Sequence, residues 1–434
     1  MREIALISHG CAKNLVDSEL MLGKLAQSGY RITLDETKAD VVIINTCSFI
    51  HDAEKESVES IFEMINAGKK IIIAGCLSQK YQKELQKLIP EALAFVGTSD
   101  IDKIVDIVKK VTKDKQIKYE VNKNPQYYYP EDVKRQQITM GASSYIKIAD
   151  GCDFNCGYCI IPQLRGNYHS RKIENIVAEA KELASKGTSE IVLIAQDTTS
   201  YGKDIYGKPS LKELLIELNK IEELSWIRIM YTYPSLLDDE LLETINNLDK
   251  VVKYIDVPLQ HVSQNMLEAM NRPKMDYKKL IRKIRKFIPK VAIRTTFIVG
   301  YPTETEEDFQ ELYDFIKTMK IDRLGVFEFS KEKNTKAYSM KPQILAKVKK
   351  QRRNALMKLQ QTVSKELNEK LIGKKIDCIV ENINEDGLAV ARSYKDAPEV
   401  DGFVYINTKT PVIPGDIITV KITGAVEYDL TAIY

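Results

Sequence analysis

The chain has 434 residues, of which 44% are hydrophobic and 29% charged, and its net charge is +3. This length predicts roughly two to four domains, and the composition is that of a globular protein without a membrane span, which needs roughly 20 apolar residues in a row. Seven cysteines are too few for a disulfide scaffold, and the net charge alone does not indicate a nucleic-acid partner. The first residues enter a strand pattern without a signal peptide, so we expect a cytoplasmic protein.

The first 110 residues alternate between short apolar runs and amphipathic stretches. Strands are expected at residues 4–8, 41–45 and 71–75, and helices at 13–28, 53–67 and 80–88. This alternation predicts a parallel α/β sheet with crossover helices, in an N-terminal domain that covers residues 1–125.

Each of these strands is followed by a cysteine, namely Cys11, Cys47 and Cys76. The carboxyl ends of parallel strands meet at one edge of a sheet, where open α/β sheets bind ligands. Three thiols at that edge favour an iron–sulfur cluster with three protein ligands and one open iron. The alternative is three small buried side chains, as free cysteines often are.

Residues 113–140 form a polar connector with a charge run at 113–115 and three tyrosines at 127–129. The tyrosines either line a substrate channel or pack the linker across two domains. We place the first domain boundary in this connector.

A second series of strand and helix patterns covers residues 138–340. Strands are expected at residues 144–149, 190–195, 226–231, 254–257, 292–299 and 323–329. About six strand–helix units predict a partial (β/α)6 barrel whose active rim lies at the carboxyl ends of its strands.

The loop after the first of these strands carries Cys152, Cys156 and Cys159, in the spacing C-x-x-x-C-x-x-C. Thiolates are the usual ligands of iron–sulfur clusters. Three of them on a 4Fe–4S cluster leave one iron free for an amine and a carboxylate. The alternatives are a chance cluster and a zinc knuckle, which needs a fourth ligand and finds only His169 nearby.

Polar groups follow later strands of this domain at Gln196, Asp197 and Glu304, and Gly300 permits a close backbone approach. For each of them an ordinary cap or turn role is the alternative. His261 also follows a strand, but we assign it no catalytic role. No catalytic residue is assigned beyond the cysteines.

The last part of the chain changes character twice. A basic segment continues into one long helix over residues 341–369, which either binds nucleic acid or links two domains as a solvated helix. Residues 370–434 then show five short strands, at 376–380, 388–392, 402–406, 417–425 and 429–433, and predict a small β-barrel with Cys378 in its core. This barrel holds ten acidic and seven basic residues, a balance of −3.

The cysteine spacing, with the aromatic Tyr158 before the last cysteine, resembles the radical S-adenosylmethionine (SAM) enzymes. The resemblance implies that the open iron binds the methionine end of SAM and that the reduced cluster splits SAM to a 5′-deoxyadenosyl radical. It also implies that rim segments, here Gln196, Asp197, Gly300 and Glu304, hold SAM.

The order of the three domains resembles the methylthiotransferase family, which joins an N-terminal cluster domain, a radical SAM core and a C-terminal TRAM barrel. Three runs are similar to the branch that modifies a ribosomal protein: residues 8–19 (SHGCAKNLVDSE), 195–199 (AQDTT) and 396–402 (DAPEVDG). His9 departs from that branch, which more often has Leu there.

The resemblance implies two 4Fe–4S clusters, SAM, and thiomethylation of an aspartate β-carbon in the small-subunit ribosomal protein S-twelve. Its partners would be that protein or the small ribosomal subunit, an electron donor and a sulfur donor. The −3 balance of the barrel favours a basic protein over tRNA as substrate. The alternatives are a tRNA adenosine 2-methylthiotransferase and a non-catalytic iron–sulfur redox module.

Overall fold

A computed structural model describes residues 2–48, 51–113, 117, 121–126, 129–131, 133–138 and 141–434. The chain forms two compact units. One comprises residues 1–140 with 150–154 and 160–169, and the other comprises 141–149, 155–159 and 170–434. Tyr127 and Tyr128 lie outside the described residues, as do Asp114 and Lys115, whereas Tyr129 is buried. The predicted domain boundaries remain predictions.

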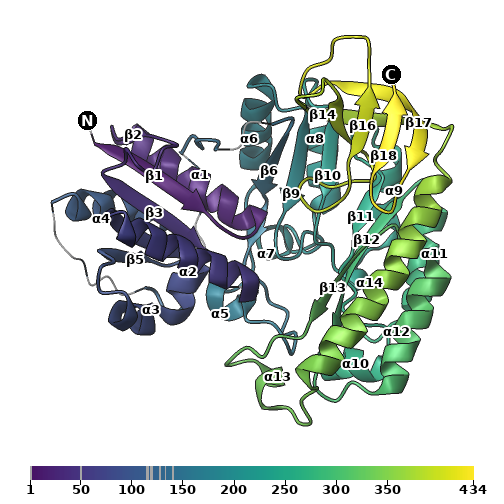
Figure 1. Cartoon of the computed structure of the whole chain (residues 1–434), viewed down its shortest axis with the longest axis horizontal. Helices are drawn as coiled ribbons and strands as arrows, with labels where there is room; N and C mark the ends of the chain where they lie inside the picture. Colours follow the sequence, from purple (N-terminus) through teal and green to yellow (C-terminus); the bar gives the residue numbers. More distant parts are fainter. Residues whose placement is uncertain are drawn as a thin grey trace. The chain divides into compact units, whose positions relative to one another are not determined.

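The first unit contains a five-stranded parallel sheet in the order β2-β1-β3-β4-β5 (Figure 1). Its strands are β1 (Glu3–Ser8), β2 (Arg31–Ile32), β3 (Val41–Thr46), β4 (Lys70–Gly75) and β5 (Ala94–Val96). Its helices are α1 (Ala12–Gln27), α2 (His51–Asn66), α3 (Cys76–Leu88), the 3-10 turn η1 (Ile101–Lys103) and α4 (Ile104–Val111). The predicted parallel sheet is confirmed; the short edge strands β2 and β5 were not predicted.

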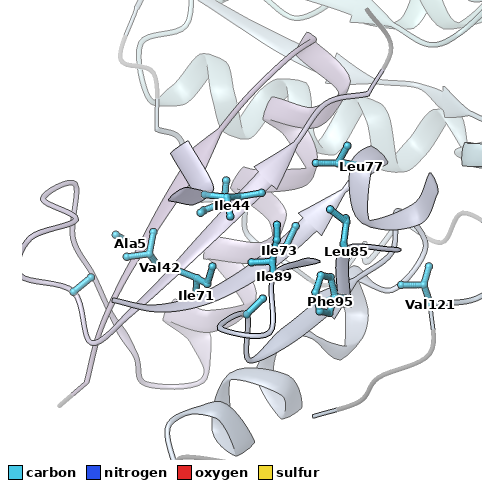
Figure 2. Packing of buried hydrophobic residues seen from close by; sticks show 13 residues of the cluster. Ala5, Val42, Ile44, Ile71, Ile73, Leu77, Leu85, Ile89, Phe95 and Val121 are labelled. Carbon is cyan, nitrogen blue, oxygen red and sulfur yellow. The ribbon is translucent and has the colours of Figure 1, made fainter. Parts of the chain in front are cut away.

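Apolar side chains fill one face of this sheet. Val42, Ile44, Ile71 and Ile73 occupy alternate positions of β3 and β4, so they project from the same face. They pack with residues of α2 and α3, and Figure 2 shows this cluster. Because β3 is buried along its whole length, the sheet is held firmly up to the strand ends where the cysteines lie.

The second unit begins with six parallel strands in two sheets, β6-β9-β10 and β11-β12-β13. Backbone hydrogen bonds such as Thr232 N–H to Asp256 O, at 2.9 Å, connect the two sheets. The strands are β6 (Ser143–Lys147), β9 (Glu190–Ile194), β10 (Trp226–Ile229), β11 (Tyr254–Asp256), β12 (Ala292–Val299) and β13 (Arg323–Glu328). The predicted six-stranded partial barrel is confirmed.

Helices surround this partial barrel (Figure 1). The longer ones are α6 (Ile173–Ser185), α8 (Leu211–Asn219), α9 (Asp239–Asn247), α11 (Tyr277–Phe287) and α12 (Glu306–Met319). The short elements of this unit are α7 (Lys203–Tyr206), η2 (Pro234–Leu236), α10 (Gln264–Ala269) and α13 (Lys336–Ser339). The helix α5 (Ile161–Arg165) belongs to the first unit, and the two-residue strands β7 (Ala149–Asp150) and β8 (His169–Ser170) each have one residue in either unit. No helix within the described parts of the chain is long and apolar enough to cross a membrane.

The long basic helix is α14 (Ala346–Glu369), and it packs along the core rather than standing free in solvent. Leu356 and Val363 are buried on one side of it, and the Gln360 side chain donates to the carbonyl of Ile321 at 2.9 Å. Arg352 is also buried, so at least this basic side chain of the segment packs inside the protein.

The C-terminal residues form a closed five-stranded barrel in the order β14-β15-β16-β18-β17. The strands are β14 (Lys375–Ile383), β15 (Ala389–Ser393), β16 (Val404–Asn407), β17 (Ile417–Ala425) and β18 (Leu430–Ile433). Cys378 is fully buried in the apolar core of this barrel, which confirms the prediction for it.

A loop of the small barrel docks against the amino-terminal ends of the core strands. Asp396 pairs with Arg323 at the start of β13, and Asp401 accepts a hydrogen bond from Tyr254 at the start of β11. Arg392 reaches Glu190 at the start of β9, at 2.6 Å. The docked loop therefore lies at the opposite end of the strands from the predicted active rim.

This docking corrects the argument from the charge of the barrel. Asp396 and Asp401 are buried against arginines of the core, so they are not available to attract a basic partner. The exposed charges are nearly balanced, with four acidic side chains (Asp377, Glu385, Asp386 and Glu399) and five lysines (Lys370, Lys374, Lys375, Lys409 and Lys421). The surplus of acidic side chains in the barrel therefore lies among its buried and half-buried residues.

Candidate metal centres

The three N-terminal cysteines lie at the carboxyl ends of neighbouring strands, as predicted. Cys11 is the N-cap of α1, Cys76 is the first residue of α3, and Cys47 follows β3 directly. A helix N-terminus carries partial positive charge, which favours a thiolate. Two of the three thiols therefore have a local environment that suits a metal ligand.

Asn14 joins these strand ends. Its side-chain amide donates to the carbonyl of His9 at 3.1 Å and to that of Thr46 at 2.9 Å. Its Oδ1 atom lies 3.8 Å from the Cys76 Sγ atom. One buried amide thus links the backbone beside Cys11 and Cys47 to the third cysteine.

Gly10 brings Cys47 close to the segment of Cys11. This glycine has φ +91°, and a Cβ atom on it would lie 2.7 Å from the Cys47 Sγ atom. Any side chain at this position would therefore occupy the space beside the sulfur. The structure brings all three predicted N-terminal ligands to one end of the sheet.

No group of three Cys, His, Asp or Glu side chains in the described ranges could hold a metal ion as they stand. A structural zinc site needs four ligands, whereas each cysteine triad supplies three thiols.

Arg165 lies beside the N-terminal cysteines and was not predicted as a site residue. Its guanidinium donates to Asp17 at 2.7 Å and Asp150 at 2.9 Å through Nη1. Through Nη2 it donates to Asn14 Oδ1 at 2.6 Å and approaches Cys76 Sγ at 3.7 Å. The side chains of all five residues are buried.

Positive charges near the thiols of Cys11 and Cys76 lower the pKa of these thiols, whereas desolvation raises it. Cys11 is an exposed residue. Desolvation of its thiol would raise the pKa, but Lys13, Arg165 and backbone N–H groups outweigh it, and the pKa is lowered. Burial raises the pKa of Cys76, and Arg165 offsets this only in part. Arg165 therefore favours the thiolate form of both residues.

Two close backbone approaches hold the segment of Cys152. The Cys152 N–H donates to the carbonyl of Gly166 at 3.1 Å. A Cβ atom on Gly151 would lie 2.0 Å from the carbonyl oxygen of Asn167, and one on Gly166 would lie 1.9 Å from that of Pro125. Glycine at both positions lets the segment pack this tightly.

Cys156 and Cys159 belong to the second unit, where Gly157 anchors them. The Gly157 N–H donates to the carbonyl of Met270, and its own carbonyl accepts from Ala337, both at 2.8 Å. The Cys159 N–H donates to the carbonyl of Cys156 at 3.0 Å. These hydrogen bonds fix the backbone that carries the two thiols.

A second buried arginine lies beside this turn. Arg272 Nη1 approaches Cys156 Sγ at 3.9 Å, and Nη2 donates to the carbonyl of Pro258 at 2.6 Å. Its guanidinium stacks over the ring of Tyr233, 4.3 Å from the centroid. Tyr158 is close to it, and burial, followed by the charge of Cys156, raises the pKa of the phenol.

Asp197 shapes the loop that follows β9. Its carboxylate accepts from the Thr199 N–H at 2.9 Å, from the Thr199 hydroxyl at 2.5 Å and from the Ser200 hydroxyl. Burial raises its pKa, and these hydrogen bonds oppose the rise. Gln196 lies at the same strand end, half-buried. SAM contacts by these two residues remain a prediction.

Glu304 lies at the centre of a buried polar cluster after β12. One oxygen lies 3.1 Å from His261 Nε2, and the other accepts from the Gly300 N–H at 2.5 Å and from Arg352 at 2.6 Å. Gly300 has φ +70°, and Lys349 fills the space beside it. Both oxygens of Glu304 thus have protein partners, and its contact with SAM remains a prediction.

The chain matches three known domain families. The Radical SAM superfamily matches residues 146–316, the Uncharacterized protein family UPF0004 matches residues 3–97, and the TRAM domain matches residues 372–434. The matches coincide with the partial barrel, the N-terminal sheet and the small barrel described above.

Relatives match over the full chain. The chain is 50% identical to a ribosomal protein uS12 methylthiotransferase RimO of Caldanaerobacter subterraneus, over 100% of both proteins. It is 46% identical to the protein of the same name in Clostridioides difficile, over 99% of this chain and 98% of that one. Among solved structures, the radical SAM methyltransferase TsrM of Kitasatospora setae is similar in fold, with a TM-score of 0.56 and 15% identity over 75% of this chain and 73% of that one.

Proposed function

Because this chain belongs to the family of ribosomal protein uS12 methylthiotransferases, we propose that it adds a methylthio group to the β-carbon of an aspartate in uS12, the small-subunit protein S-twelve. In this reaction a C–H bond of the β-carbon breaks and a C–S bond to the methylthio group forms.

The observation that carries the proposal is the presence of two separate cysteine triads. Cys11, Cys47 and Cys76 lie at the strand ends of the N-terminal sheet, whereas Cys152, Cys156 and Cys159 lie in one short loop. A radical SAM enzyme that only cleaves SAM needs the loop alone. A second triad provides for a second cluster, and the family resemblance implies that the open iron of this cluster holds the sulfur that is transferred.

When bound, the two 4Fe–4S clusters and SAM supply a carbon radical, a methyl group and an open iron for sulfur. The residues that would hold the clusters are the two cysteine triads, since thiolates are the usual protein ligands of iron–sulfur clusters. Gly10 and Gly157 suit this role, since a Cβ atom would meet the Cys47 side chain at Gly10 and the Tyr301 hydroxyl at Gly157.

The residues beneath the second cysteine loop form an apolar floor. Met266, Met270, Tyr301 and Phe329 are buried there, and Tyr158 packs against them. An apolar floor excludes water from the loop and protects a reactive radical from side reactions. The chain's own part in the reaction is therefore to position the cofactors and to keep this region dry.

The family assignment also sets the expected partners. The substrate is uS12 or the small ribosomal subunit that contains it, and the reaction needs an electron donor and a sulfur donor. Such a substrate fits a cytoplasmic location. Modification of tRNA adenosine is the competing activity, and the test below separates the two.

The test is anaerobic reconstitution of the full chain with iron, sulfide and SAM, followed by incubation with uS12 and a reductant. We expect 5′-deoxyadenosine and a methylthio group on one uS12 aspartate, detected by peptide mass spectrometry. The matched control is the Cys152→Ala/Cys156→Ala/Cys159→Ala variant, which should form neither product. A methylthio group on tRNA adenosine with uS12 unmodified would overturn the proposed substrate.

A further inference from the structure

Arg165 connects the N-terminal cysteines to the loop of the second triad within one compact unit. Its two terminal nitrogens reach Asn14 and Asp17 of α1, Cys76 of α3, and Asp150, which lies two residues before Cys152. The Asp150 side chain in turn accepts from the Gly151 N–H at 2.9 Å.

We propose that Arg165 is a positioning residue of the N-terminal cluster. Its charge and hydrogen bonds hold the cysteine thiolates that would bind the cluster, and its positive charge raises the reduction potential of the cluster. The inference rests on the proposed function, because it assumes a cluster on Cys11, Cys47 and Cys76. It concerns the protein's own charges around that cluster, which the family assignment does not specify.

The sign of the effect follows from the charges. Reduction adds an electron to a cluster that already carries negative thiolates, so a buried positive charge nearby favours the reduced form. The guanidinium supplies that charge, and the carboxylates of Asp17 and Asp150 oppose it. Removing the arginine should therefore lower the potential, whereas neutralising one carboxylate should raise it.

The geometry requires arginine rather than lysine. Asp17 and Asp150 accept from one nitrogen, while Asn14 and the Cys76 sulfur face the other. A planar guanidinium presents these donors in a fixed fork, whereas an ammonium is a point charge on a flexible stem. Arg165→Lys should keep the positive charge but should hold the surrounding side chains in a less fixed arrangement.

The test isolates the N-terminal cluster in the full chain by using the Cys152→Ala/Cys156→Ala/Cys159→Ala background. Reduction potentials are then measured by EPR-monitored redox titration for Arg165→Met, Arg165→Lys and Asp17→Asn. We expect a shift to lower potential for Arg165→Met, a smaller shift in the same direction for Arg165→Lys, and a shift to higher potential for Asp17→Asn.

The matched control is Arg135→Met. Arg135 is a buried arginine of the same unit that pairs with Glu19 of α1 at 2.9 Å. Glu19 lies two positions after Asp17, roughly 200° around the helix. This variant should lose stability as Arg165→Met does, but leave the cluster potential unchanged.

The outcomes separate the two proposals. If the background variant binds no cluster, the proposed function fails and this inference fails with it. If the cluster is present but its potential does not move, or moves in the same direction for Arg165→Met and Asp17→Asn, only the inference is overturned. Should Arg165→Met fail to fold, Asp17→Asn decides alone, because an unchanged or lower potential contradicts the proposal.

Discussion

The hydroxyl of Tyr301 occupies the space that a side chain at Gly157 would need, since a Cβ atom on that glycine would lie 2.5 Å from the phenol oxygen. Tyr301 is fully buried, and its hydroxyl donates to the carbonyl of Ala269 at 3.1 Å. The phenol therefore cannot move aside freely, and the turn between Cys156 and Cys159 depends on glycine.

Gly157→Ala should displace this turn. Overpacking of a buried site costs about 1–3 kcal/mol, and we expect roughly a tenfold fall in SAM cleavage, measured as 5′-deoxyadenosine. Removing the phenol oxygen in Gly157→Ala/Tyr301→Phe should restore part of the activity. Gly141→Ala is the control, because no atom lies within 4 Å of a Cβ there. Full activity of Gly157→Ala would contradict the prediction.

The two cysteine triads should be separable by substitution. Replacing Cys152, Cys156 and Cys159 by Ala should leave about half of the bound iron and abolish SAM cleavage, because each cluster depends on its own thiolates. Replacing Cys11, Cys47 and Cys76 should spare SAM cleavage but stop methylthio transfer. Iron analysis with product detection tests both, and unchanged iron in either variant would refute the assignment of two clusters.

Glu190 should make stability depend on pH. Burial alone would raise its pKa, but Arg228 and Arg392 outweigh burial and lower the pKa from 4.5 to about 2. A depressed carboxyl pKa stabilises the fold above pH 4.5, and this contribution, up to about 3 kcal/mol, is lost as the pH falls towards 2.

Glu190→Gln tests this expectation in urea denaturation of the cluster-free full chain. At neutral pH the variant should be less stable by about 3–5 kcal/mol, because buried arginines lose their carboxylate. The difference from the unchanged protein should shrink between pH 4.5 and 2. Glu217→Gln, which removes an exposed pair with Lys220, should show no such trend. A constant difference across this range would contradict the assigned pKa.

Glu304 was predicted from sequence to contact SAM, but its carboxylate bonds to Arg352, His261 and Gly300. Glu304→Gln and Arg352→Met should therefore both lower stability, by about 3–5 kcal/mol for a broken buried pair. Both variants should change the SAM dissociation constant by less than roughly threefold, which corresponds to a small change in the free energy of binding. A loss of SAM binding confined to Glu304→Gln would establish the direct contact.

Two acidic residues of the small barrel should behave differently when reversed. Asp401→Lys should destabilise the docked loop, because it places a cation beside Arg294 and the buried Tyr254. Glu399→Lys changes an exposed side chain and should weaken uS12 binding less than about threefold, with the effect fading at high salt. Binding assays at two salt concentrations, with thermal unfolding alongside, distinguish these effects. If both variants lost uS12 binding equally and stayed folded, Glu399 and Asp401 would both be contacts of the substrate.

The fold was predictable because the hydrophobic residues of most helices and strands recur in the sequence with the period of that element. The strand over Ala292–Val299 was predicted with its full bounds, and the five strands of the small barrel were all located. The edge strand Arg31–Ile32 was missed because two residues give no periodic signal.

The site was predictable only where the signal is local. Cysteines that follow strands, or lie close together in one loop, show in the sequence itself. Arg165 does not, because its partner Asp17 is 148 positions away. The charge of the small barrel misled for the same reason, since Asp396 and Arg323 are 73 positions apart and neutralise each other inside the fold.

The docking of the small barrel has a consequence for the order in which the protein is made. Arg323 is buried, and the carboxylate that pairs with it belongs to Asp396. A ribosome that synthesises this chain exposes the arginine 73 residues before its partner. Domains generally fold from the amino terminus during synthesis, but here Arg323 lacks the Asp396 carboxylate until the loop of the small barrel has been made. Burial of the start of β13 is thereby tied to the synthesis of the small barrel.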